Sequence, residues 1–234
     1  MTGRVILSES TWQQPTPSTT TDVRRTVVAA VTQRVAANLP GRILVAIDGR
    51  TGAGKTSFGH ELAEQLAAHG LTVLRASLDD FKRPWADRHL YDRESGEGYY
   101  RNAFDYEAVT RLLLEPFCDK ASEGVVLCAI DPITQIDHSA TRVSVPEDAV
   151  LVVDGVFAFR DEIAHWWTLR VWLDVDPGLS LERGIARDGE PARAVHRDRY
   201  GVAERVYLAE AGPVARAHVV IDNSNLTVPV MVRG

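Results

Sequence analysis

The sequence predicts an α/β domain with three layers, in which helices flank a mainly parallel central sheet. Two observations lead to this fold class. Short apolar runs of strand length alternate with longer segments that suit helices, and strands separated by helices form parallel sheets. A glycine-rich turn also follows the first apolar run and precedes a helical segment. The 234 residues suit one domain, which at this length can bury a substantial core.

The chain begins with a polar stretch. Residues 8–20 are rich in Ser, Thr, Gln and Pro, a composition typical of connecting segments rather than of a core. We therefore expect residues 1–20 to be a flexible N-terminal lead-in and residues 21–234 to form the single folded domain.

An amphipathic helix is expected at the start of that domain. Thr21 or Asp22 can cap its N-terminus, and Gly41 can end it. The apolar positions recur every four residues. They are Val23, Val27, Val31, Val35 and Leu39. This helix could cover the sheet or mediate assembly into a homo-oligomer.

Strands and helices alternate after this first helix. Strands are predicted at the apolar runs 42–48, 71–78, 125–130, 149–153, 169–175 and 218–222. Helices are predicted at 55–69, at 105–122 with Asp105 as the cap, at 178–188 and at about 202–211. Segments 81–103 and 131–147 are long, polar and irregular, so we expect substrate-binding loops at the carboxyl ends of the strands.

Composition limits the partners. The net charge is −6 and the pI is about 5.7, which gives no general attraction to nucleic acid or to anionic lipid. No apolar run approaches the length of a membrane span, and the start of the chain lacks an apolar run of signal-peptide length. Cys118 and Cys128 are too few for a disulfide framework. We expect a cytoplasmic protein without nucleic-acid or membrane partners.

One motif dominates the sequence. Residues 49–56 read GRTGAGKT and match G-x-x-x-x-G-K-[ST] at every fixed position, after a predicted strand and before a predicted helix. Glycines let successive backbone N–H groups surround an anion, and the following helix directs its positive end to the same place. The motif predicts a P-loop NTPase fold. The residues expected to bind the nucleotide are Gly49, Arg50, Thr51, Gly52, Ala53, Gly54, Lys55, Thr56 and Ser57.

Three residues receive roles from the motif and its surroundings. Lys55 is expected to reach the β- and γ-phosphates of the nucleotide, and the Thr56 hydroxyl to bind Mg²⁺. Asp154 ends a predicted buried strand, where an acid can hold the same Mg²⁺ directly or through water. An acid at that place can also simply cap a loop.

Asp79 is the candidate catalytic base. It follows the second of the predicted sheet strands, where a carboxylate would lie beside the phosphate loop. Phosphorylation of a hydroxyl requires a group that orients the hydroxyl or takes its proton. The alternative is that Asp79 and Asp80 are solvated loop acids or cap a turn.

Two arginines indicate a lid. Arg183 and Arg187 are four residues apart on a predicted helix and so share a face, where they could neutralise charge on the transferring phosphoryl group. We place a small helical lid at about residues 178–200. The alternative is a solvated helix with local ion pairs to Glu182 or Asp188.

Several segments, taken in order, resemble the uridine kinase branch of the phosphoribulokinase, uridine kinase and pantothenate kinase superfamily. They are GRTGAGKTSF, SLDDFKRP, GYYRNAFD, VVDGVFAFR, LERGIARD and HVVIDN, and the resemblance spans about residues 42–223. It implies ATP as the donor, Mg²⁺, and a primary hydroxyl as the acceptor, in that family the ribose 5′-OH. It also implies that Asp79 is the catalytic aspartate and Asp154 the Walker B acid.

The same resemblance implies where the acceptor binds. Ile130 and Gln135 stand where uridine-cytidine kinases carry a Tyr and a His for base recognition, and Tyr99 stands where they carry a ribose-binding aspartate. Asn102 or Asp131 could replace that aspartate as a hydroxyl ligand. Further candidates for the acceptor site are Asp80, Phe81, Trp85, His89, Arg93, Tyr100 and Arg101.

Three functions are compatible with these features. The first is an ATP- and Mg²⁺-dependent kinase of a small molecule, most simply a nucleoside such as uridine or cytidine. The second is the same reaction on a sugar, a pantothenate-like alcohol or glycerate. The third is a nucleotide-binding switch with slow ATPase activity, in which Asp79 and the arginines would have no evident purpose.

Overall fold

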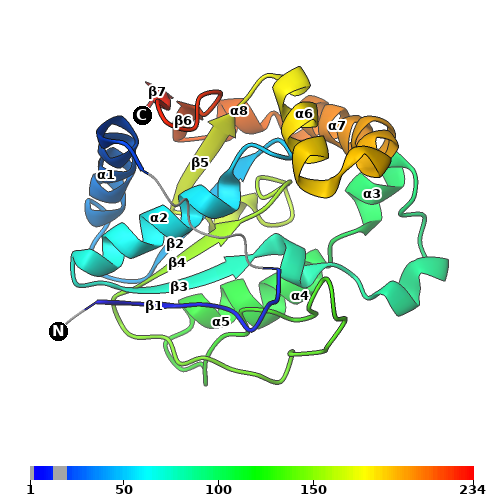
Figure 1. The fold of residues 1–234 in the computed structure, drawn as a ribbon. Helices are drawn as coiled ribbons and strands as arrows, with labels where there is room; N and C mark the ends of the chain where they lie inside the picture. The colour runs from blue at the N-terminus through cyan, green and yellow to red at the C-terminus, as the bar shows by residue number, and fades with distance from the viewer. Residues whose placement is uncertain (1–2, 13–19) are drawn as a thin grey trace.

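A computed structural model of the protein describes residues 3–12 and 20–234. Its centre is a seven-stranded sheet in the order β1-β3-β4-β2-β5-β6-β7, in which all neighbours are parallel except β6 and β7 (Figure 1). The strands are β1 (Arg4–Ile6), β2 (Ile43–Gly49), β3 (Thr72–Ser77), β4 (Ala149–Asp154), β5 (Leu169–Asp174), β6 (Val219–Asp222) and β7 (Val230–Arg233). The predicted α/β class and mainly parallel sheet are confirmed.

Helices cover both faces of the sheet. The α-helices are α1 (Asp22–Ala36), α2 (Lys55–Ala68), α3 (Gly96–Asn102), α4 (Tyr106–Ala108), α5 (Glu115–Cys118), α6 (Pro177–Asp188), α7 (Gly201–Ala211) and α8 (Pro213–Arg216). Two π-helical segments, Val109–Leu114 and Val195–Tyr200, join α4 to α5 and lead into α7. Short 3-10 turns lie at Leu78–Phe81, Trp85–His89, Ala164–Trp166 and Glu190–Ala192. None of the helices in these described ranges is long and apolar enough to span a membrane.

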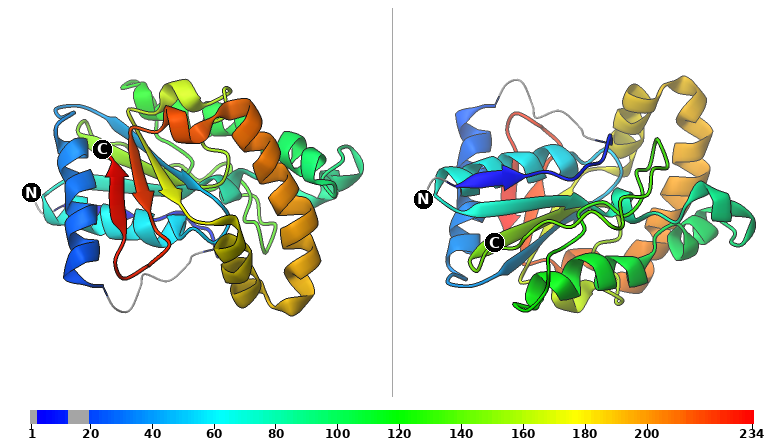
Figure 2. Two further views of the ribbon diagram at one scale, coloured as in Figure 1. Left: turned by 90° about the horizontal axis from the view of Figure 1, so that it is seen from above. Right: turned by 90° about the horizontal axis from the view of Figure 1, so that it is seen from below.

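The central strands are apolar on both faces because both faces are covered. In β2, Ile43, Val45 and Ile47 pack with α1 and α2, whereas Leu44 and Ala46 pack with the opposite core around α4 and α5. Figure 2 shows these two layers, with α6 and α7 beyond the carboxyl ends of the strands. This arrangement leaves the β2–α2 turn facing the helices that follow β5.

The first helix departs from the predicted pattern. Val28, Val31 and Val35 are buried, whereas Val23 is 44% exposed. Residues four apart in a helix are offset by about 40°, so a strict four-residue repeat drifts off one face over several steps. Thr21 is the N-cap, and its side chain accepts a hydrogen bond from the Arg24 N–H.

The run 125–130 was predicted to be a strand, and this prediction is wrong. Val125 makes only an isolated bridge with Val143, and the Ala129 and Ile130 N–H groups both donate to the Asp80 carbonyl. The run is apolar because it lies in the core near α5, not because it pairs in the sheet. A short apolar run does not distinguish these two environments.

The N-terminal residues also differ from expectation. Arg4–Ile6 form β1, which pairs in parallel with β3 and so adds an edge strand to the sheet. Val5 and Ile6 pack against the two cores. The described part of the lead-in, residues 3–12 and 20, is therefore built into the domain, and residues 13–19 lie outside the described residues.

Candidate active site

The phosphate loop joins β2 to α2. Gly52 and Gly54 have φ values of +72° and +88°, a region that side chains rarely adopt. A Cβ atom at Gly54 would also lie 2.9 Å from the Asn223 side-chain nitrogen, which donates to the Ala53 carbonyl at 2.7 Å. The two glycines are therefore needed for the tight turn, which ends at the first residue of α2.

Lys55 points back over this loop. Its Nζ donates to the carbonyls of Gly49 and Arg50 at 3.1 and 2.8 Å. Burial lowers the pKa of Lys55, although the negative charges of Asp48 and Glu204 act to raise it. The ammonium group is thus held inside the loop, where it can meet phosphate oxygens as a point charge.

The α7 helix contributes an unpredicted contact to the same loop. Glu204 is buried. Its carboxylate accepts a hydrogen bond from the Thr51 N–H at 2.7 Å and forms an ion pair with Arg50 at 3.2 Å. Asp48, on β2, accepts hydrogen bonds from the Tyr207 hydroxyl and the Phe159 N–H. Burial raises the pKa of Asp48 to about 6. These contacts connect the loop to the helices beyond the sheet.

Thr56 and Asp154, the two residues predicted to bind Mg²⁺, are in direct contact. The Thr56 hydroxyl donates to Asp154 Oδ2 at 2.6 Å, and the Arg75 guanidinium pairs with Asp154 Oδ1 at 2.7 Å. Arg75 comes from β3 and Asp154 from the neighbouring β4, and both side chains are almost fully buried. One carboxylate oxygen is thus fixed by Arg75 and the other is directed at the loop.

This buried ion pair leads to a prediction about stability. Arg75→Met should lower the free energy of unfolding by about 3–5 kcal/mol, because Asp154 would keep a buried charge without its partner. Urea denaturation would measure the difference, with Arg111→Met as the control at an exposed helical position. An unchanged denaturation midpoint in Arg75→Met would contradict the importance of the pair.

Asp79 lies at the carboxyl end of β3 and is paired with a lysine. The Ser77 hydroxyl accepts from its backbone N–H, and Lys82 Nζ lies 2.5 Å from its carboxylate. Burial alone would raise the pKa of Asp79, but the charge of Lys82 and its hydrogen bond, with Lys55 and Arg187, hold that pKa below its ordinary value. The carboxylate is therefore kept ionised, as a group that takes a proton must be.

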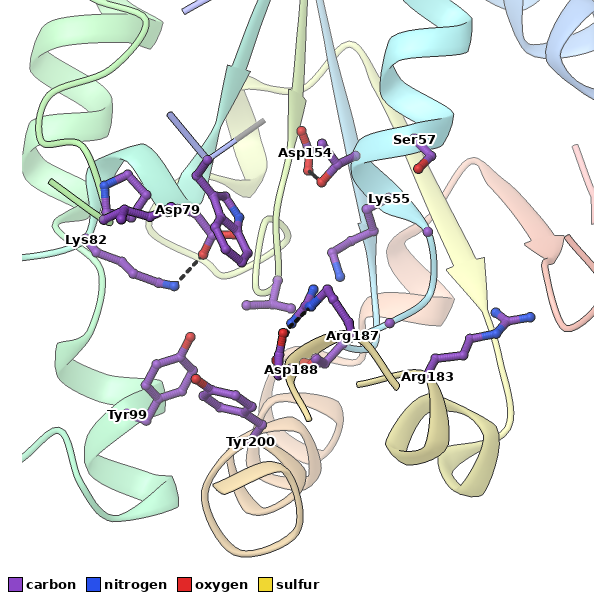
Figure 3. A pocket seen from close by; sticks show the side chains of 18 of the residues that line it. Lys55, Ser57, Asp79, Lys82, Tyr99, Asp154, Arg183, Arg187, Asp188 and Tyr200 are labelled. Atoms are coloured by element: carbon purple, nitrogen blue, oxygen red, sulfur yellow. Dashed lines mark hydrogen bonds and ion pairs between the residues drawn. The ribbon is translucent and has the colours of Figure 1, made fainter. Parts of the chain in front are cut away.

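The two lid arginines have different surroundings. Figure 3 shows Arg187 directed toward Lys55 and Asp79, whereas Arg183 points to the rim. Arg187 pairs with Asp188 at 2.7 Å. The Arg183 guanidinium donates to the carbonyls of Asn223 and Ser224 at 3.1 and 2.7 Å.

These groups line one pocket of about 460 Å³. From the phosphate loop and α2 it includes Thr51, Gly52, Gly54, Lys55, Thr56 and Ser57, and from the strand ends Asp79, Lys82, Asp154 and Val156. The remaining lining residues are Trp12, Tyr99, Pro132, Ile133, Arg183, Arg187, Asp188, Tyr200 and Leu226 (Figure 3). The nucleotide motif, the candidate base and the arginines thus share one cavity.

Among the described residues, Tyr99 alone of the acceptor candidates lines this pocket. Arg93 is buried and donates to the carbonyls of Arg83 and Pro84, which shape the loop after β3. Tyr100 lies beneath the Arg160 guanidinium, 4.2 Å from it, and Phe81 is in the core.

The remaining acceptor candidates serve local structure. Arg101 pairs with Glu97 and Glu210, and Asn102 donates to the Asp92 carbonyl. Trp85 is 48% exposed, and His89 contacts the Ala86 carbonyl. The Gln135 side chain accepts a hydrogen bond from the Trp85 backbone N–H and does not line the pocket. Pro132 and Ile133 of the same loop do line it. Asp80 and Asp131 are buried and accept hydrogen bonds from the N-terminal segment.

Sequence reasoning missed Lys82, Tyr200 and Trp12 as pocket residues. Lys82 could have been noticed, since it is one of three lysines in the chain and lies three residues after Asp79. Trp12 carried no such signal, because it lies in a polar segment far from every motif. Within the described residues, no group of three or more His, Cys, Asp or Glu side chains is arranged to hold a metal ion.

Comparison with known proteins finds similar kinases. The chain is 26% identical over 195 residues to a uridine kinase of Deinococcus deserti. This alignment covers 80% of this chain and 91% of the relative. It is 24% identical to a uridine kinase of Ligilactobacillus salivarius over 63% of this chain and 67% of that protein. A solved structure of a possible uridine kinase from Bacillus stearothermophilus aligns with a TM-score of 0.66 and 25% identity, over 84% of this chain and 97% of that one.

The family model for these kinases covers most of the domain. It matches residues 44–207, from the second residue of β2 through the phosphate loop and the two arginines of α6 to α7. The resemblance inferred from the motifs is therefore confirmed, and ATP is the phosphate donor that the family implies. The chain belongs to the phosphoribulokinase / uridine kinase family.

Proposed function

We propose that this kinase transfers the γ-phosphate of ATP to a primary hydroxyl of a nucleoside, most simply the 5′-OH of uridine or cytidine. The observation that carries the proposal is the single pocket that Asp79 shares with Lys55 and Arg187. A hydroxyl held by Asp79 would face the phosphate that Lys55 binds. The relatives named uridine kinases support a nucleoside as the acceptor.

Each residue has a defined part in this proposal. The loop N–H groups and Lys55 bind the phosphates, while Asp79 accepts a hydrogen bond from the acceptor hydroxyl and takes its proton as the bond to phosphorus forms. Arg187 meets the negative charge on the transferring group. Together these side chains hold donor and acceptor in line, which is the main requirement of phosphoryl transfer.

The residues also suit Mg²⁺. Thr56 and Asp154 place two hard oxygen donors 2.6 Å apart beside the phosphate loop, and Mg²⁺ is commonly held by one or two such groups together with phosphates and water. We propose these two residues as its ligands. When bound, the ion would neutralise charge on the β- and γ-phosphates.

The direct test is ADP release from ATP and Mg²⁺ with a panel of ribonucleosides, deoxynucleosides, sugars and pantothenate. Lys55→Ala serves as the blank. Release that depends on uridine or cytidine is expected. Release with a sugar or another alcohol alone would keep the kinase chemistry but overturn the nucleoside proposal. Slow release regardless of acceptor, abolished in Lys55→Ala, would instead favour a nucleotide-binding switch.

Lys82 should set the pH dependence of this reaction. Lys82→Met removes the positive charge that lowers the pKa of Asp79, so that pKa should rise. A base acts only when deprotonated, and the acidic limb of the profile of kcat/KM against pH should therefore move to higher pH. Lys120→Met is the control, because Lys120 is exposed and pairs with Glu147 far from the pocket residues. An acidic limb at the same pH in both variants would contradict this role.

A further inference from the structure

The N-terminal segment Arg4–Trp12, called here the strap, runs from the edge of the sheet to the active site. It begins as β1 beside β3 and then passes the carboxyl ends of the strands toward α6 (Figure 2). The family model matches residues 44–207, so the strap lies outside the matched region.

Two buried carboxylates hold the strap in place. The Ser8 hydroxyl donates to Asp80 at 3.2 Å, and Asp80 is 1% exposed. Thr11 donates to Asp131 through its backbone N–H at 2.6 Å and through its hydroxyl at 3.0 Å. Burial acts to raise the pKa of Asp131, but its hydrogen bonds from Thr11 and from the N–H groups of Thr134 and Ile133 bring that pKa below its ordinary value, so this carboxylate is ionised. Hydrogen bonds to ionised acceptors are stronger than those between neutral groups. The sequence placed Asp80 and Asp131 at the acceptor, and the structure uses them to position the strap.

The strap ends by placing an indole in the pocket. The backbone N–H of Trp12 donates a hydrogen bond to the Ser10 hydroxyl at 3.1 Å, and this contact turns the chain here. Trp12 lines the same cavity as Asp79 and Lys55. The Arg187 guanidinium lies 5.5 Å from the centre of its ring, within the range of a cation–π contact. Trp12 thus touches both the pocket and the lid.

Part of the remaining pocket lining is apolar or aromatic. Pro132 and Ile133 come from the loop after the apolar run 125–130, and Tyr99 comes from α3. With Trp12 they supply apolar and aromatic surface to a cavity whose charges come from Asp79, Lys82 and Lys55. The two kinds of lining are interleaved, since Lys82 Nζ lies 5.9 Å from the centre of the Tyr99 ring and the Arg187 guanidinium lies against Trp12. Such a lining suits a molecule with a flat apolar part and a hydroxyl.

We propose that Trp12 is a specificity-determining residue of the acceptor site, where its indole packs on a planar ring of the acceptor such as a nucleobase. This inference rests on the proposed function for the identity of the acceptor. The strap positions Trp12, and Arg187 holds the indole from the lid side. In this proposal, binding of the acceptor depends on a segment that lies outside the matched residues 44–207.

The test compares Trp12→Ala, Trp12→Phe and the control Trp85→Ala, using the acceptor that gives the fastest ADP release in the panel. Trp12→Ala should raise the KM for that acceptor about 10-fold or more, the loss expected when a ring loses its aromatic partner. The KM for ATP should change less than about twofold, because the phosphate loop is untouched. Trp12→Phe should restore most of the acceptor affinity, and Trp85→Ala should match the wild-type protein, since Trp85 lies outside the pocket.

A second variant tests the strap itself. Thr11→Val removes one hydrogen bond to Asp131 without altering a pocket residue, and it should raise the acceptor KM in the same direction but less than Trp12→Ala does. Thermal denaturation confirms that each variant is folded. An acceptor KM in folded Trp12→Ala equal to that of Trp85→Ala would overturn the proposal.

The outcome for the strap can be separated from the outcome for the nucleoside. If the wild-type protein uses only a sugar, the nucleoside proposal and the planar-ring inference both fail. If no acceptor in the panel is used, the proposed function fails. The strap is then tested by the slow hydrolysis of ATP, in which the γ-phosphate is transferred to water. Loss of the indole should raise that hydrolysis at least about threefold by admitting water to the pocket. An unchanged hydrolysis rate would then overturn the role of the strap.

Discussion

Replacement of Asp79 by Asn is expected to lower kcat by about two to four decades, the usual contribution of a positioned general base. The amide has nearly the same shape but cannot take the proton of the acceptor hydroxyl. The change should leave ATP binding close to that of the wild-type protein, because the phosphates meet Lys55 and the loop N–H groups rather than this carboxylate. Steady-state kinetics and titration with a fluorescent ATP analogue would measure the two quantities.

The control for this variant is Asp87→Asn. Asp87 belongs to the same region after β3, on the turn Trp85–His89, but it does not line the pocket. Its replacement should change kcat less than about twofold, as most substitutions away from a site do. A fully active Asp79→Asn protein would remove Asp79 from the mechanism and leave the hydroxyl without a base.

The parts of the fold that rest on local patterns could be predicted from the sequence. The β2–α2 turn requires glycines at fixed places and a helix that starts at Lys55. Both features can be recognised within the eight consecutive residues 49–56. Five apolar runs became strands of the sheet because strands covered on both faces need apolar residues at every position. The pairing of Thr56 with Asp154 followed from the same reasoning, since parallel strands end at one edge.

The remainder of the pocket could not be predicted because its residues are assembled from distant segments. Asp131 was expected at the acceptor but is fully buried against Thr11, a contact between residues 120 positions apart. No periodicity or motif in the sequence predicts such a pairing. The π-helical segment before α7 brings Tyr200 to the pocket in the same way. Sequence patterns therefore predicted the phosphate loop and its position beside Asp154, whereas the other pocket residues could be found only in the tertiary structure.

The two lid arginines should differ strongly in their effect on catalysis. Arg187→Ala is expected to lower kcat by about 10²–10³, the cost of removing one group that meets developing charge in an active site. Arg187 faces the pocket, and its charge is among those that lower the pKa of Asp79. Arg183 is one helical turn earlier, and its guanidinium is occupied by the carbonyls of Asn223 and Ser224.

Arg183→Ala is therefore the matched control, because it removes the same side chain from the same helix. We expect it to lower kcat less than about fivefold, since most substitutions away from reacting groups have small effects. Comparison of single-turnover rates for the two variants separates chemistry from product release. Equal losses in both would indicate that the lid acts through its overall charge. A loss confined to Arg187→Ala would mean that a single guanidinium, the one that lies against Trp12, meets the transferring phosphoryl group.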